Sequence, residues 1–101
     1  MHLIQLFLPL HDNAANAFPT ELFRRVQQEL TERFGGLTGF TRAPVEGLWT
    51  QDVEVKKDDL VIYEVMTNDL DRSWWRSYRL DLEARFRQEH LIVRAQEAEL
   101  L

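Results

Sequence analysis

The sequence of 101 residues contains no cysteine and no long hydrophobic run. The absence of cysteine excludes disulfide bonds, thiolate catalysis and sulfur-ligated zinc or iron sites. The apolar runs are far shorter than the roughly 20 residues that a membrane-spanning helix needs. The first residues carry neither a basic leading segment nor a small-residue cleavage site, so we predict a cytoplasmic protein without a membrane partner.

Positive charge is also scarce, because 12 Lys and Arg stand against 17 Asp and Glu, for a formal net charge of -5. The arginines are spread among glutamates along both expected helices instead of forming a patch, so nucleic acid is not an expected partner. Hydrophobic residues make up 45% of the chain, a balance typical of globular proteins. The length predicts a single domain over residues 1–101, and so small a domain is often stabilised by self-association.

Four segments have the alternation or the composition of β-strands. They are residues 2–8, 37–42, 60–66 and 91–94. Pro9 closes the first strand because proline cannot donate to a ladder, and Pro44 favours an edge position for the second. The acidic segment that follows the last strand is predicted to be frayed.

Two segments carry an apolar stripe at helical spacing. The first runs from Thr20 to Phe34 and is followed by two glycines, which can take the left-handed conformation that ends helices. The second follows the capping candidates Asn68, Asp69 and Asp71. Its stripe consists of Trp75, Tyr78, Leu82 and Phe86.

The order strand, helix, strand, strand, helix, strand predicts an α+β protein with a ferredoxin-like βαββαβ fold. In this arrangement the first and third strands lie in the middle of a four-stranded antiparallel sheet, and both helices cover one face. We assign Ile4, Leu6 and Leu8, with Val61, Tyr63 and Val65, to the helix side; the alternative is the opposite parity, in which Glu64 faces the helices and has a paired structural role. With our assignment the opposite face is apolar as well, with Leu3, Phe7, Leu60, Ile62 and Met66, joined by Phe40 or its neighbours.

This second apolar face is larger than a monomer normally exposes, so we predict a homodimer in which a second copy covers it. Gln5 and Glu64 lie on the same face, on strands that should be neighbours. A glutamate in a dry interface must be paired, hydrogen-bonded or protonated. Glu64 and Gln5 therefore mark either a small cavity with Glu64 as base or acceptor, or an interface ion pair of Glu64 with Arg42 or Arg94.

Other candidate groups are few. The three histidines have no spacing that makes a metal pair, so no metal and no cofactor is expected. His11, in the loop after the first strand, is the better functional candidate among them, although a plain surface histidine is the alternative. Trp49 is a candidate for holding a ligand, with core packing as the alternative.

Several motifs carry a family resemblance. They are Gly36-Leu37-Thr38 through Glu46-Gly47-Leu48-Trp49, the strand Leu60 to Val65, and Tyr78 through Ala84-Arg85-Phe86-Arg87-Gln88-Glu89. This pattern resembles a family of small uncharacterised bacterial proteins of ferredoxin-like type. The resemblance implies the fold, adds no reaction, and points to Trp49, Arg85, Gln88 and Glu89. More widely, the layout is similar to the dimeric α+β barrel superfamily, which includes cofactor-free monooxygenases and isomerase-like enzymes.

Three functional hypotheses follow. The first is a homodimeric small-molecule-binding domain with a pocket on the open sheet face, lined by Gln5, Arg42, Trp49 and Glu64. The second is a cofactor-independent monooxygenase or isomerase of the dimeric barrel type, with Glu64 or His11 as base. The third is a structural or interaction module without a ligand.

Overall fold

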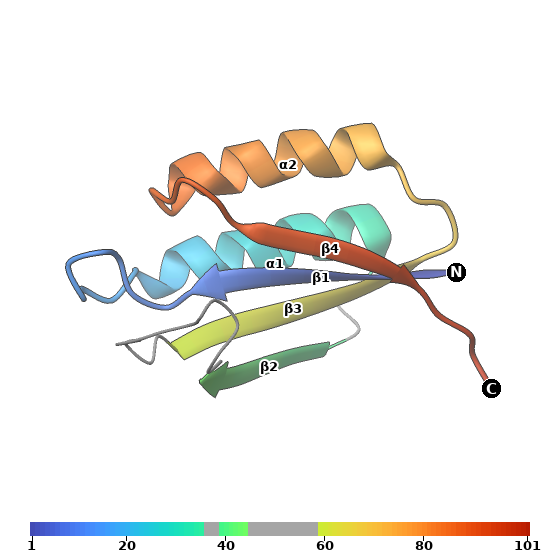
Figure 1. The fold of residues 1–101 in the computed structure, drawn as a ribbon, viewed down its shortest axis with the longest axis horizontal. Helices are drawn as coiled ribbons and strands as arrows, with labels where there is room; N and C mark the ends of the chain where they lie inside the picture. Colours follow the sequence, from blue (N-terminus) through green and yellow to red (C-terminus); the bar gives the residue numbers. More distant parts are fainter. Residues whose placement is uncertain (36–38, 45–58) are drawn as a thin grey trace.

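The computed structural model describes the backbone of residues 1–35, 39–44 and 59–101, and the side chains of residues 1–35 and 60–101. Its elements lie in the α+β order that the sequence predicts (Figure 1). They are β1 (His2–Pro9), α1 (Thr20–Phe34), β2 (Gly39–Pro44), β3 (Asp59–Thr67), α2 (Arg72–Arg85) and β4 (Ile92–Glu97). Within the described ranges, no helix is long and apolar enough to cross a membrane.

The strands form an antiparallel sheet in the order β2-β3-β1-β4. The first and third strands of the chain are therefore the central ones, and β2, which ends at Pro44, lies at an edge as predicted. The register places Gln5 of β1 opposite Glu64 of β3 on one side and opposite Arg94 of β4 on the other. Three neighbouring strands of the sheet, β3, β1 and β4, thus place these polar residues in one row.

The core lies between the sheet and the two helices. From the sheet it receives the six residues that the alternation assigned to this side. They are Ile4, Leu6, Leu8, Val61, Tyr63 and Val65. Both helices contribute to the same cluster, α1 with Val26 and Leu30 and α2 with the stripe that includes Leu82. Because the side-chain period of a strand is two, this burial fixes Leu3, Gln5 and the other odd positions of β1 on the opposite face.

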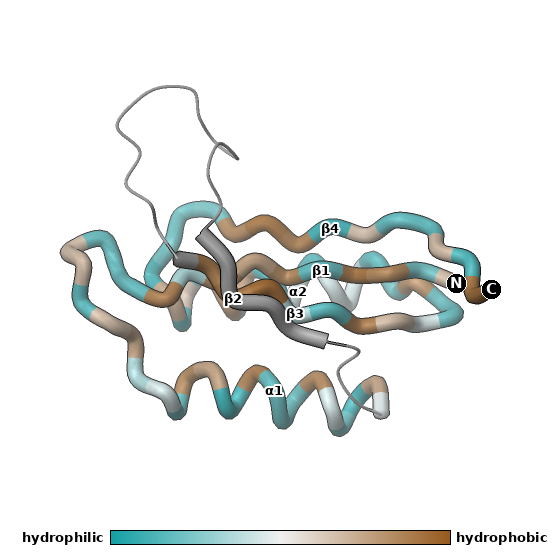
Figure 2. Tube along the Cα trace, turned by 90° about the horizontal axis from the view of Figure 1, so that it is seen from below, coloured by the Kyte–Doolittle hydropathy of each residue, from teal (hydrophilic) through white to brown (hydrophobic). Residues whose placement is uncertain are grey.

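The last strand differs from its prediction. We expected it to end at Arg94 and the acidic residues after it to fray, whereas β4 continues to Glu97. Its burial falls from half-buried at Ile92 to exposed from Arg94 onward, and Figure 2 shows the matching change from hydrophobic to hydrophilic along the strand. Backbone pairing with β1 holds the segment, as in the pair of Glu97 with His2. A polar composition is compatible with an edge strand, and charged residues there discourage pairing with other chains.

The sequence provides a capping residue at the end of α1 and another at the start of α2. Gly35 follows α1 with φ 84°, in the left-handed region, and its N–H donates to the carbonyl of Thr31 at 2.8 Å. At the start of α2, an Asp71 carboxylate oxygen accepts from the backbone N–H of Trp74 at 3.1 Å. Of the three capping candidates, Asp71 is therefore the residue that caps the helix.

Replacing Asp71 with alanine is expected to lower the free energy of unfolding by about 1 kcal/mol, because an N–H of the first turn loses its acceptor. Asp71 also lies 3.7 Å from the Arg33 guanidinium, which makes the loss composite. Asp71→Asn separates the contributions, since asparagine caps nearly as well without a charge. Urea denaturation should show most of the stability retained in Asp71→Asn, and an equal loss in both variants would assign the effect to the ion pair.

Candidate functional site

The open face of the sheet carries a row of three polar side chains. The Arg94 Nε–H donates to Gln5 Oε1 at 2.8 Å, and Gln5 Nε2 donates to Glu64 Oε2 at 2.7 Å. Arginine can only donate and a carboxylate can only accept, so the two contacts fix the orientation of the Gln5 amide. The result is a directed chain of hydrogen bonds that ends on the carboxylate of Glu64.

This geometry bears on the two hypotheses for Glu64, a small cavity or an interface ion pair. Glu64 is half-buried, and among the described side chains its carboxylate accepts from the Gln5 amide and from no arginine. Arg94 reaches Glu64 only through the Gln5 amide, and its guanidinium lies 5.0 Å from the ring centre of Phe7. Glu64 is thus held in place by an amide donor. A carboxylate positioned in this way can accept hydrogen bonds from a further donor, such as the hydroxyl or amine of a ligand.

The apolar surroundings of this polar row are less exposed than the sequence predicts. Phe7 and Leu60 lie on the open face and outside the helix-side core, yet they are only 5% and 6% exposed. Leu3, Ile62 and Met66 are half-buried. Among the described residues, the large hydrophobic side chains that count as exposed are Met1, Leu80, Leu100 and Leu101. None of these four lies within a strand of the sheet, so the free apolar area of the open face is smaller than expected.

The remaining ligand-binding candidates are not brought to Glu64 by the described structure. Arg42 pairs with Val61 in the backbone register, and Phe40 pairs with Tyr63. Glu64 is opposite Gly39. Trp49 lies outside the described residues. The described site therefore consists of Gln5 and Glu64 from the prediction, with Arg94 as the residue that completes the row.

His11 occupies the loop that follows β1. It is exposed and forms an isolated bridge with Ala17. Next to it, Asp12 organises the turn by accepting from the backbone N–H groups of Asn16 and Ala14. The bond from Asn16 lowers the pKa of Asp12. These contacts stabilise a turn, which gives the loop a structural role. Among the described residues, His11 is not a hydrogen-bond partner of Glu64.

Two of the residues that the family resemblance points to, Arg85 and Gln88, have structural contacts. Arg85 donates two hydrogen bonds to Glu29 of α1, at 2.9 and 3.0 Å, and the hydroxyl of Tyr78 donates to the same carboxylate at 2.8 Å. We call this group the α1–α2 clamp. Gln88 lies in the turn after α2, where its backbone N–H donates to the carbonyl of Glu83, and Glu89 is exposed.

The contacts of the α1–α2 clamp shift the pKa values of Glu29 and Tyr78. Burial by itself would raise the pKa of Glu29, but the hydrogen bonds from Arg85 and Tyr78 and the charge of Arg85 outweigh it and lower that pKa. Burial and the bond to Glu29 raise the pKa of Tyr78. The charged carboxylate and the protonated phenol are therefore the forms that the folded helices favour.

A second group of polar residues was missed by the sequence analysis. Arg72, Arg76 and Arg79 of α2 line a hollow between this helix and β4. The sequence predicts arginines spread among glutamates, whereas Arg72, Arg76 and Arg79 stand at positions i, i+4 and i+7 and share one helix face. That spacing was the available signal. Over the described parts of the chain, no group of three or more His, Asp or Glu side chains gathers to hold a metal ion.

Comparison with known proteins gives one informative likeness. No family model matches the sequence, and no curated protein does. Among solved structures, the chain is similar to a phage SAM lyase in complex with S-methyl-5'-thioadenosine, with a TM-score of 0.57 and 17% sequence identity. The match covers 95% of this chain and 80% of the lyase chain. At this identity the likeness shows a shared α+β fold.

Proposed function

We propose that this protein is a small-molecule-binding domain whose site is the open sheet face around Glu64. The observation that carries the proposal is the directed chain from Arg94 through Gln5 to the Glu64 carboxylate, set among half-buried apolar side chains. A surface that is mostly apolar, with a few fixed polar groups, is the usual composition of a ligand site. The ligand is a flat or apolar molecule that carries hydroxyl or amine donors for Glu64.

The structural likeness supports this proposal at the level of the fold. The phage SAM lyase of similar fold was solved with S-methyl-5'-thioadenosine, a molecule with a flat base, a thioether and ribose hydroxyls. Such hydroxyls are common donors to an acidic side chain in nucleoside sites. The same molecule is therefore a suitable first probe for this chain.

We infer further that the fold is ferredoxin-like and that a second copy of the chain covers the open face. The inference rests on the half-buried Leu3, Ile62 and Met66, which are on the sheet face opposite the helix-side core. Two such faces packed around a two-fold axis would bury these side chains and enclose a ligand at Glu64. The resemblance to small bacterial ferredoxin-like proteins stays a prediction.

The test of the proposed site is a titration with S-methyl-5'-thioadenosine followed by two-dimensional NMR. We expect saturable shifts of the backbone amides of Gln5, Glu64 and Arg94. In Glu64→Gln the hydrogen bonds to the ligand lose their charge, and binding should weaken about tenfold, which corresponds to about 1.4 kcal/mol. The matched control is Glu97→Gln, which removes the same charge from the edge strand β4 at a helix-side position and should bind as the wild type does.

Two results would count against the site, and a third against the class of ligand. One is unchanged affinity in Glu64→Gln. Another is a set of shifted amides that lies away from the open face, for example along α1. The third is the absence of saturable binding at millimolar probe, which would remove nucleoside thioethers as the ligand class.

A further inference from the structure

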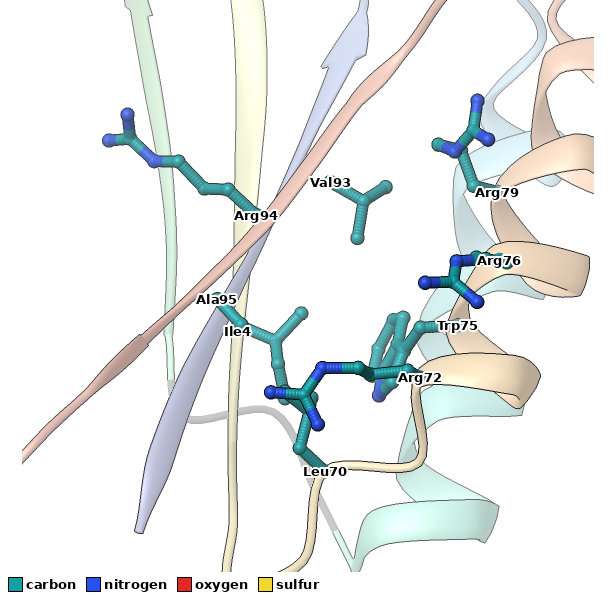
Figure 3. A pocket seen from close by; sticks show the side chains of 9 residues that line it. All are labelled: Ile4, Leu70, Arg72, Trp75, Arg76, Arg79, Val93, Arg94 and Ala95. Carbon is teal, nitrogen blue, oxygen red and sulfur yellow. The ribbon is translucent and has the colours of Figure 1, made fainter.

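A hollow of about 200 Å³ lies between α2 and β4, and neither Gln5 nor Glu64 lines it. Its apolar lining comes from the sheet, from the segment before α2 and from α2 itself (Figure 3). This lining includes Ile4, Val93, Leu70 and Trp75. Arg72, Arg76 and Arg79 line it from α2. We call it the α2–β4 hollow.

The arginines are turned toward the hollow by the periodicity of α2. Residues three or four positions apart lie on one side of a helix, so the face with Arg72, Arg76 and Arg79 is adjacent to the stripe of Trp75 and Tyr78 that packs in the core. Figure 3 shows the side chains of Arg72 and Arg76 extending from the helix toward the strands. An anchored helix face thus presents two guanidinium groups beside an apolar surface.

The distribution of ion pairs among the arginines also points to the α2–β4 hollow. Nine arginines have described side chains, and six of them lie within 4.0 Å of a carboxylate. The other three are Arg72, Arg76 and Arg94, and all three line the α2–β4 hollow. In Figure 3 the Arg94 side chain points away from α2, toward the face where it bonds to Gln5. Among the described residues, Arg72 and Arg76 therefore have no carboxylate partner, in a chain with an excess of acidic residues.

Arg79 differs from its two neighbours because it is already held. Its guanidinium donates to Glu83 at 2.8 Å, and the same carboxylate oxygen accepts from the backbone N–H of Leu91 at 3.0 Å. These bonds fix Arg79 at one end of the hollow and neutralise much of its charge. The charge that remains for a ligand belongs to Arg72 and Arg76.

We propose that the α2–β4 hollow is a binding site for a small organic anion. A phosphate or carboxylate group meets the guanidinium groups of Arg72 and Arg76, whose planar forks match the geometry of such oxyanions. The body of the ligand rests on the apolar lining beside Trp75. The volume of the hollow is below the roughly 300–1,000 Å³ typical of sites for drug-sized molecules. A ligand of matching size is a single ring that carries a phosphate or carboxylate group.

The experiment uses phenyl phosphate as the probe and follows the NMR signals of the arginine Nε–H groups and of the Trp75 indole. Inorganic phosphate tests the charge alone, phenol tests the ring alone, and benzoate distinguishes a carboxylate from a phosphate. We expect phenyl phosphate to bind more tightly than phosphate or phenol. In the Arg72→Gln/Arg76→Gln double variant, its affinity should fall at least about tenfold, as expected for the loss of charged hydrogen bonds.

The matched control removes the same two charges elsewhere, in Arg24→Gln/Arg87→Gln. Both control side chains are about two-thirds exposed and ion-paired, at 65% and 66% exposure. At physiological salt distant charges are screened beyond about 8 Å, so this variant should bind phenyl phosphate within about twofold of the wild type. An equal loss in both double variants would overturn the proposal, because the attraction would then be general. Absence of saturable shifts in the wild type would overturn it as well.

This site is independent of the proposed function at Glu64. The variants lie on α2, and the readout is the arginine and indole signals instead of the amides of the open face. Failure at either site therefore leaves the other one standing.

Discussion

Replacing Leu6 with alanine is expected to lower the free energy of unfolding by about 3 kcal/mol. Leu6 is fully buried in the core cluster, at 0% exposure, on the central strand β1. Truncating such a leucine removes its transfer free energy and leaves a cavity that close-packed neighbours fill only in part. Small domains of this kind have about 5–15 kcal/mol of stability in total, so the loss is large. Chemical denaturation measures it directly.

Leu3→Ala is the control on the same strand. Leu3 has the opposite parity and is half-buried on the open face, so its truncation should cost only about 1 kcal/mol in a monomer. The comparison tests the assignment of faces on which the site around Glu64 depends. Equal losses for Leu6→Ala and Leu3→Ala would contradict that assignment.

The second large effect is expected at the α1–α2 clamp. Arg85→Met keeps the apolar stem of the side chain but removes both hydrogen bonds to Glu29. Bonds to charged groups contribute about 1.5–3 kcal/mol each, and water that reaches Glu29, whose side chain is 31% exposed, weakens them. We expect a loss of about 2 kcal/mol. Arg24→Met, which breaks a fully surface pair with Glu21, should change the stability by less than about 0.5 kcal/mol.

The clamp also predicts a pH dependence. The pKa of Glu29 is lower in the folded protein than its ordinary value of 4.5, so the unfolded chain binds the proton more readily. The stabilisation is present above pH 4.5 and is lost as the pH falls through the folded pKa. Arg85→Met should show a smaller loss in this acid range. If the wild type and the variant lose stability in parallel between pH 5 and pH 2, Glu29 is not the group responsible.

Most of the fold could be predicted from the sequence because its local signals agree with one another. Pro9, Gly35 and Asp71 stand at the element ends that they predict, and the alternation along β1 identified the core side correctly. The end of β4 could not be predicted, since a polar edge strand is stabilised by its pairing with β1 and has no hydrophobic pattern of its own.

The site was predictable to a lesser extent. The proximity of Gln5 and Glu64 follows from the adjacency of the first and third strands, and the structure contains their hydrogen bond. The part played by Arg94 depends on the register of β4, which the sequence does not specify. The burial of Phe7 and Leu60 on the open face is likewise a tertiary property, which parity alone does not reveal.

The α2–β4 hollow is a second feature that could not be predicted from the sequence alone. The sequence shows the spacing of Arg72, Arg76 and Arg79, but it does not show which arginines find carboxylate partners. Arg33 and Arg87 do so across long sequence separations, with Asp71 and Asp12. Only the three-dimensional arrangement identifies Arg72 and Arg76 as the pair without a carboxylate partner in the described part of the chain.

Native mass spectrometry of the freshly purified protein tests the central claim, that the open face around Glu64 holds a small molecule beneath a second copy of the chain. The account predicts a species at twice the 12.0 kDa chain mass with a retained small molecule, and loss of that molecule in Glu64→Gln. A 12.0 kDa species without any adduct, identical in the wild type and in Glu64→Gln, would contradict it.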